Sequence, residues 1–242
     1  LVPALSCLYW LVLSASKPRS AFLIGWMFGF GYFLVGLYWV GYAFLVNATQ
    51  HAIFALPAVI GLCLFLGFWI GMACWCHRMF FRLRFGNVGG VLLFALLWTF
   101  FEWVRAWIAS GFPWNMVGSI WAFSDTMIQS AAFIGTYGLS LITVFVGCCP
   151  AAVLYVSKGA ISKRWSPLVT GICVISALWI LGVMRLSTAD TDFVPNMMLR
   201  LVQPNISQVD KWNANLRDGH ILRQIDMSIN GHDDDNQDFP PS

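Results

Sequence analysis

The residues of this chain that could take part in chemistry lie mainly in three short stretches. The first, FFEWVRAWI, places Glu102 and Arg105 three residues apart, and so on one face of a helix. Ionisable side chains in so apolar a stretch are costly unless they are paired or functional. The residues alone favour an ion pair that fixes the depth of the helix over a contact with a substrate, and both interpretations remain open.

The second stretch, GFPWN at residues 111–115, joins a glycine and a proline to a large aromatic ring and a polar amide. Pro113, Trp114 and Asn115 are therefore candidate substrate-binding residues. The alternative is an aromatic anchor at a membrane interface, next to a proline that ends a helix. Nothing in the segment itself decides between the two.

The third stretch, QPNISQVDKW, spans residues 203–212. Gln203 and Trp212 are candidate substrate-binding residues because they lie at the end of a predicted strand and in the loop after it, where binding residues often gather. The alternative is ordinary turn and helix-capping chemistry around Pro204.

Catalytic and metal-binding groups are not predicted from the residues. Nucleophilic catalysis needs a Ser, Cys or Lys beside a base, and GLS at residues 138–140 is not a GxSxG elbow. Cys74 and Cys76 lack a second ligand pair, so small packing residues are favoured over a metal site. The four histidines, His77 at a helix end among them, are expected to be solvated.

The elements that must position these residues are membrane helices. With 59% apolar and 10% charged residues and a mean hydropathy of +0.71, the chain is far from the composition of soluble proteins. A helix that crosses a bilayer needs about 20 apolar residues. The predicted helical stretches are residues 1–13, 21–46, 53–76, 88–108, 134–156 and 167–186. Because the first residue is Leu1 and no charged segment precedes it, the first stretch is expected to be clipped.

Charge alternates between the connectors of these stretches. Lys and Arg occur in SASKPRS, HRMFFRLRF and SKGAISKRW, whereas the connector around NATQH and residues 106–133 have none. This positive-inside pattern predicts a multi-pass protein whose basic connectors are cytoplasmic and whose C-terminal part is outside. The basic excess faces lipid headgroups, so no nucleic-acid partner is expected.

Two segments depart from the simple helical pattern. The connector at residues 106–133 is too long for a turn and too apolar for a solvated loop, which predicts an interfacial or reentrant segment. After residue 187 a β-prone run at 197–206 precedes a helical pattern that reaches residue 229. We therefore expect a membrane bundle (1–186), the start of an α/β domain with one strand and one helix (187–230), and a disordered tail (231–242).

Small residues predict where helices pack closely. Gly25 with Gly29, and Gly67 with Gly71, have GxxxG spacing. Such spacing lets two helix backbones approach each other, so these glycines are expected at a helix–helix contact.

Three segments taken together resemble the bacterial apolipoprotein N-acyltransferase family of the carbon-nitrogen hydrolase superfamily. They are LLWTFFEWVRAWIASGFPWNMVGS (96–119), GTYGLS (135–140) and RLVQPNISQVDKW (200–212), and GFGYFLVGLYWVGYA (29–43) is similar to the family's early helices. The resemblance implies a membrane bundle that carries a nitrilase-like α/β domain on the periplasmic side of the bacterial inner membrane. It places the substrate-binding interpretation of the three stretches level with aromatic anchoring.

The family's activity follows from the same resemblance. Members transfer an acyl chain from a phospholipid donor to the N-terminal amine of a diacylated lipoprotein acceptor, through a Glu, Lys, Cys triad and without a cofactor. The triad Glu lies in a Trp-Pro-Glu motif that is not found in residues 1–242. Lys211 belongs to the QxxKW motif and is not the triad Lys. No catalytic residue is assigned, and a truncated chain that is inactive alone is expected. The alternatives are a non-catalytic membrane scaffold that binds lipid or lipoprotein, or, less favoured, a small transporter.

Overall fold

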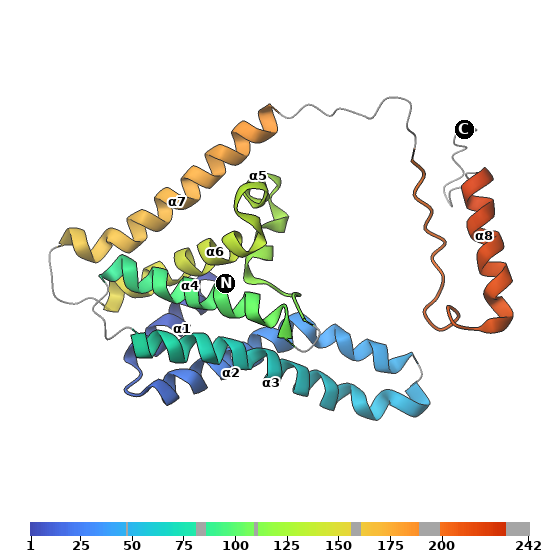
Figure 1. Ribbon diagram of the computed structural model, residues 1–242, viewed down its shortest axis with the longest axis horizontal. Coiled ribbons are helices and arrows are strands. Elements are labelled where there is room, and N and C mark those ends of the chain that lie inside the picture. Colours follow the sequence, from blue (N-terminus) through green and yellow to red (C-terminus); the bar gives the residue numbers. More distant parts are fainter. Residues whose placement is uncertain (47, 81–85, 109–110, 156–160, 189–198, 231–242) are drawn as a thin grey trace. The chain divides into compact units, whose positions relative to one another are not determined.

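The computed structural model describes residues 1–46, 48–80, 86–108, 111–155, 161–188 and 199–230 (Figure 1). The chain divides into two compact units. The first comprises Leu1–Gly41 with Leu56–Ala189, and the second comprises Tyr42–Ala55 with Asp190–Ser242. Arg82, Arg84 and Lys158 of the basic connectors, and the predicted disordered tail at 231–242, lie outside the described residues.

The predicted apolar stretches are all helical. The long helices are α1 (Val2–Ser14), α2 (Pro18–Leu37), α3 (Ala48–Phe80), α4 (Asn87–Arg105), α6 (Ala131–Tyr155) and α7 (Ile161–Ser187), and a 3-10 helix η1 (Tyr38–Leu45) continues α2. Within the described residues, five segments are long and apolar enough to cross a membrane: α2 with η1, α3, α4, α6 and α7. The predicted helical bundle is therefore confirmed, and five of its segments have the length and composition of membrane-spanning helices. The 13 residues of α1 are fewer than a span requires.

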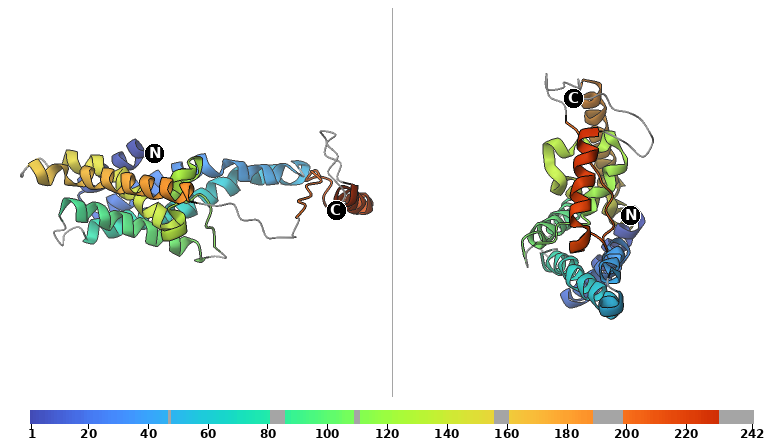
Figure 2. Two further views of the ribbon diagram at one scale, coloured as in Figure 1. Left: turned by 90° about the horizontal axis from the view of Figure 1, so that it is seen from above. Right: turned by 90° about the vertical axis from the view of Figure 1, so that its right-hand side faces the viewer.

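Helix α6 is the centre of the first unit. It packs against α1, α4 and α7, and Figures 1 and 2 show α7 next to α6 where α7 begins and next to α5 at its other end. The hydroxyl of Ser6 on α1 donates to the carbonyl of Gly147 on α6 at 2.6 Å. Prolines in the first turns of α1 and α2 suit positions where no helical acceptor is available for a backbone N–H.

The GxxxG prediction is confirmed by the contact between α2 and α3. A Cβ on Gly29 would lie 2.7 Å from the Cα of Gly67, and one on Gly25 would lie 2.5 Å from the sulfur of Cys74. The backbones approach so closely that a larger side chain at Gly29 would force the helices apart.

The starts of α4 and α7 meet at one end of the bundle. The side chain of Asn87, at the start of α4, donates to the carbonyl of Lys163 near the start of α7 at 2.7 Å.

His77 is not solvated as expected. Its side chain is fully buried between the rings of Tyr9 and Phe94, at 5.4 and 5.3 Å between centroids, and its Nε2 lies 3.2 Å from the carbonyl oxygen of Gly90. The prediction failed because α1 packs over this end of α3.

The second unit contains the predicted helix but not the predicted strand. Helix α8 (Arg217–Asn230) follows a short 3-10 turn at Ala214–Leu216. Residues 199–206 have no regular secondary structure, and residues 197–198 lie outside the described part of the chain. A strand requires backbone hydrogen bonds to a neighbouring strand, and no strand occurs among the described residues to provide them.

Candidate functional site

The connector after α4 begins with an irregular segment and two short helices. Residues 111–116 lead into a 3-10 helix, η4 (Val117–Phe123), and then α5 (Asp125–Ile128), which pack against α6 and α7. Gly111 and Asn115 have φ values of 80° and 56°. A Cβ at Gly111 would lie 2.0 Å from the carbonyl oxygen of Ala106, so only glycine fits this turn.

Arg105 binds the backbone of this segment. One terminal nitrogen donates to the carbonyl oxygens of Phe112 at 2.9 Å and Trp114 at 2.8 Å. The guanidinium also lies over the ring of Phe33 on α2, 5.0 Å from its centroid. Arg105 is only 2% exposed because it lies among α2, α4 and residues 112–114. A charged donor of this kind makes strong hydrogen bonds to backbone carbonyls.

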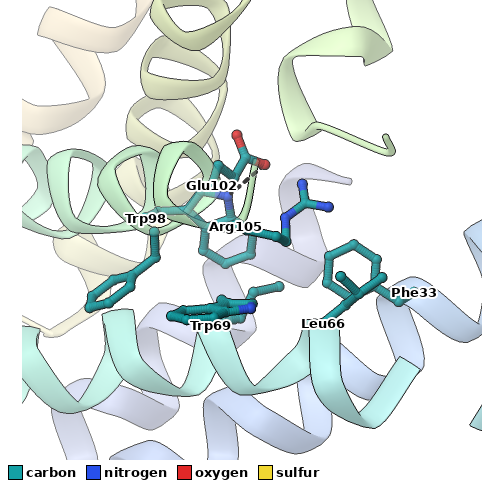
Figure 3. A pocket seen from close by; sticks show the side chains of 8 residues that line it. Phe33, Leu66, Trp69, Trp98, Glu102 and Arg105 are labelled. Carbon is teal, nitrogen blue, oxygen red and sulfur yellow. Dashed lines mark hydrogen bonds between the residues drawn. The ribbon is translucent and has the colours of Figure 1, made fainter. Parts of the chain in front are cut away.

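Glu102 binds the same connector at Val117, on the C-terminal side of the residues that Arg105 binds. Its Oε1 accepts hydrogen bonds from the backbone N–H of Val117 at 3.0 Å and from Nε1 of Trp98 at 3.2 Å, the bond drawn in Figure 3. The first of these bonds satisfies a donor at the start of η4, where a helix has no acceptor of its own. Glu102 and Arg105 therefore clamp the two ends of residues 112–117. We call Glu102, Arg105 and residues 112–117 the connector clamp.

The favoured interpretation of Glu102 and Arg105 as an ion pair is wrong. Both side chains lie on one side of α4 as predicted, but each binds the connector, and Figure 3 shows their charged groups pointing in different directions. A cavity of only about 10 Å³ lies beside them, lined by apolar side chains such as Phe33, Leu66 and Trp69. This volume is about that of one water molecule, so neither charged group opens onto a ligand-sized pocket here.

Helix α2 and η1 hold the other side of the segment. The hydroxyl of Tyr32 donates to the carbonyl oxygen of Asn115 at 3.1 Å. Gly36 leaves room for the Asn115 amide, because a Cβ there would lie 2.1 Å from its nitrogen. Trp39 stacks on Trp114 with 5.4 Å between ring centroids. Sequence reasoning did not assign Tyr32, Gly36 or Trp39 to the site.

The structure thus brings five of the seven candidate residues together. Glu102, Arg105 and Asn115 are half-buried or buried, whereas Pro113 and Trp114 are exposed. Gln203 and Trp212 belong to the second unit, where Trp212 is 82% exposed with the Lys211 ammonium 5.7 Å from its ring centroid.

No metal site was predicted. The described residues contain no group of three or more His, Cys, Asp or Glu side chains that could hold a metal ion.

Comparison with known proteins decides the family. Residues 1–149 match the Apolipoprotein N-acyltransferase N-terminal domain. The chain belongs to the apolipoprotein N-acyltransferase family. The apolipoprotein N-acyltransferase of Rickettsia typhi is 35% identical over 231 residues, which cover 94% of this chain and 45% of the relative.

Two further family members give the same result. The apolipoprotein N-acyltransferase of Rhodopseudomonas palustris is 34% identical over 221 residues, covering 89% of this chain and 40% of its own length. That of Allorhizobium ampelinum is 41% identical over 196 residues, covering 81% of this chain and 35% of its own length. The chain spans less than half the length of these apolipoprotein N-acyltransferases. The connector clamp lies inside the part matched by the N-terminal domain of the family.

Proposed function

We propose that this chain forms the membrane-embedded, substrate-handling part of an enzyme that transfers an acyl chain from a phospholipid to the N-terminal amine of a diacylated lipoprotein. It would reside in the bacterial inner membrane with residues 187–230 on the periplasmic side. Family membership supports the reaction type, and the charge pattern of the connectors supports the orientation. The observation that carries the site is the connector clamp, which holds Trp114 on the surface beside Trp39.

Within this site the residues have different roles. The exposed Pro113 and Trp114 are proposed to contact the acyl chains or glycerol backbone of a lipid substrate, because a rigid aromatic surface at an interface offers apolar contact area. Arg105 and Glu102 are proposed as positioning residues, since their hydrogen bonds end on the backbone of the connector. Asn115 is held by Tyr32 and fixes the turn that follows Trp114.

Residues 187–230 are proposed to begin a nitrilase-like α/β domain, and residues 231–242 to be a separate tail. The resemblance of RLVQPNISQVDKW to the family and the observed helix α8 support the first assignment. Residues 199–206 would become a strand only when further strands of such a sheet pair with them. Gln203 and Trp212 are proposed to contact substrate from this domain.

Residues 1–242 alone are proposed not to catalyse the transfer, because the family's Trp-Pro-Glu motif does not occur in them. Expression of this chain in a strain depleted of its own N-acyltransferase should leave lipoproteins diacylated. Mass spectrometry of the lipoprotein N-terminus gives the answer directly. Triacylated lipoprotein would contradict this part of the proposal.

The substrate site is tested in a chimera that joins residues 1–230 to the remaining part of the Rickettsia typhi relative. Trp114→Ala and Trp212→Ala should lower acyl transfer more than they lower protein abundance. Trp165→Ala is the matched control, since Trp165 is also exposed but lies at the start of α7, the end of the bundle with the basic connectors. If all three variants lose activity only in proportion to protein level, Trp114 and Trp212 are anchors and the site assignment is wrong.

A further inference from the structure

A groove lies far from the connector clamp, at the other end of α2. The groove, of about 370 Å³, runs between the start of α2 and the end of α3, and it is lined by Arg19, Phe22, Leu23, Met72 and Trp75. Four of these side chains are apolar or aromatic, and the fifth is a cation. Within the described residues, the exposed side chain of Arg19 makes no hydrogen bond, so its charge is available to a ligand.

The close packing of α2 against α3 builds the wall of this groove. Phe22 lies across Gly71, where a Cβ would come within 2.9 Å of the Phe22 ring. The same ring meets Phe68 edge-on, with 5.6 Å between centroids. The ring of Phe22, a residue of α2, is held against α3 in this way. The groove wall is therefore part of the packed helix pair and does not depend on a freely rotating side chain.

Charged and apolar residues are arranged in two levels along both helices. On α3, Met72, Trp75 and Arg78 recur every three residues and so share one face. On α2, Arg19 precedes Phe22 by the same spacing. One helical turn of about 5 Å therefore separates a cationic level from an aromatic level. This is the order in which a phospholipid presents its phosphate and the upper part of its acyl chains.

The positive charges around the groove favour a lipid with a negatively charged headgroup. In residues 1–186 the only acidic residues are Glu102 and Asp125, and neither belongs to α2 or α3. Lys17, Arg19 and Arg78 thus lie at this end of the helix pair without an acidic residue on either helix. We propose that the groove binds an anionic phospholipid of the cytoplasmic leaflet, with its phosphate at Arg19 and an acyl chain along Phe22 and Trp75.

This lipid is distinct from the acyl donor of the proposed reaction. Arg19 lies in the first turn of α2, whereas Gly36 near the end of α2 lies next to Asn115 of the connector clamp. Seventeen residues of helix separate them by about 25 Å, which is most of the thickness of a bilayer core. The lipid in the groove would anchor the α2–α3 pair on the side opposite to the substrates, so the inference does not depend on catalysis.

The test uses the complete 242-residue chain in phosphatidylcholine vesicles that contain phosphatidylglycerol. Brominated acyl chains quench tryptophan fluorescence on contact, and the bromine is placed on one lipid at a time. The contribution of Trp75 is the difference between the unsubstituted chain and Trp75→Phe. Brominated phosphatidylglycerol should quench Trp75 more than brominated phosphatidylcholine at the same mole fraction. Arg19→Gln should reduce this preference about fivefold, the contribution expected of one basic residue near an anionic surface.

Lys163→Gln is the matched control, since it removes one exposed positive charge from the same end of the bundle but not from the groove. It should leave the preference unchanged. Equal quenching by the two lipids, no quenching by either, or equal loss in Arg19→Gln and Lys163→Gln would overturn the proposal. Mass spectrometry of lipids retained by the purified chain provides a second readout without a Trp75 variant. There, Arg19→Gln should retain less phosphatidylglycerol than Lys163→Gln, and equal retention would contradict the proposal.

Discussion

The indole rings of Trp39 and Trp114 are stacked, with 5.4 Å between their centroids and 23° between their planes. The two residues are 75 positions apart in the sequence, and both remain partly exposed, Trp39 by 41% and Trp114 by 56%. Stacked aromatic pairs contribute about 1 kcal/mol beyond the area that they bury. The stack therefore joins η1 to the connector clamp and leaves one broad aromatic surface.

Replacing Arg105 by Gln should loosen the connector. The variant leaves the carbonyl oxygens of Phe112 and Trp114 without their charged donor, and we expect a loss of about 2–4 kcal/mol in stability. Thermal unfolding in detergent and the rate of proteolysis at residues 111–116 measure it. Arg185→Gln is the control, because Arg185 is exposed and its side chain contacts the Gln129 side chain and the Phe133 ring. Equal effects of the two variants would contradict the clamp.

Replacing Glu102 separates the role of its charge from that of its oxygen. Glu102→Gln keeps an acceptor for the Val117 N–H and should cost about 1 kcal/mol or less, whereas Glu102→Leu leaves that buried donor unpaired and should cost about 1–3 kcal/mol. Unfolding of both variants, compared with the unsubstituted chain, distinguishes them. If Glu102→Gln is as unstable as Glu102→Leu, the negative charge of Glu102 is itself required for stability.

The orientation of the bundle is tested with reporter tags. Tags after Lys17, Arg84 and Lys163 should report the cytoplasm, because those connectors carry the Lys and Arg residues. Tags near Asp125 and at the C-terminus should report the outside. A C-terminal tag that reports the cytoplasm would contradict the topology. It would also contradict the proposed function, because the lipoprotein acceptor of that reaction would be modified on the outer face of the inner membrane.

The helices could be predicted from the sequence because each is specified by its own apolar stretch. The stretch at 134–156, for example, corresponds to α6 at Ala131–Tyr155. The partners of Glu102 and Arg105 could not be predicted, although their shared face was. Apart from the Trp98 side chain one turn earlier, their partners are backbone groups, which carry no residue-type signal. The burial of Arg105 also depends on Phe33, about 70 residues earlier. The strand prediction relied on alternation alone, and alternation cannot supply a pairing partner.

Gly67→Ala tests the contact between α2 and α3. Its Cβ would lie 2.7 Å from the backbone nitrogen of Phe30, which cannot move aside as a flexible side chain would. The helices must separate, at a cost of about 1–3 kcal/mol. Gly61→Ala on the same helix is the control, since nothing lies within 4 Å of its new Cβ. Unfolding in mixed micelles compares them, and equal stability of the two variants would argue against close backbone packing.

Gly36→Ala tests how α2 holds the connector clamp. The new Cβ would lie 2.1 Å from the Asn115 amide nitrogen, so the amide must move and carry with it the turn next to Trp114. We expect the stack of Trp39 on Trp114 to weaken, with a loss of about 1–3 kcal/mol in stability. Gly31→Ala is the matched control on α2, because its Cβ meets nothing within 4 Å and should stabilise the helix slightly. Near-ultraviolet circular dichroism reports the aromatic stack and thermal unfolding reports stability. If Gly36→Ala behaves like Gly31→Ala in both measurements, Asn115 is not held against α2 and the connector is positioned by α4 alone.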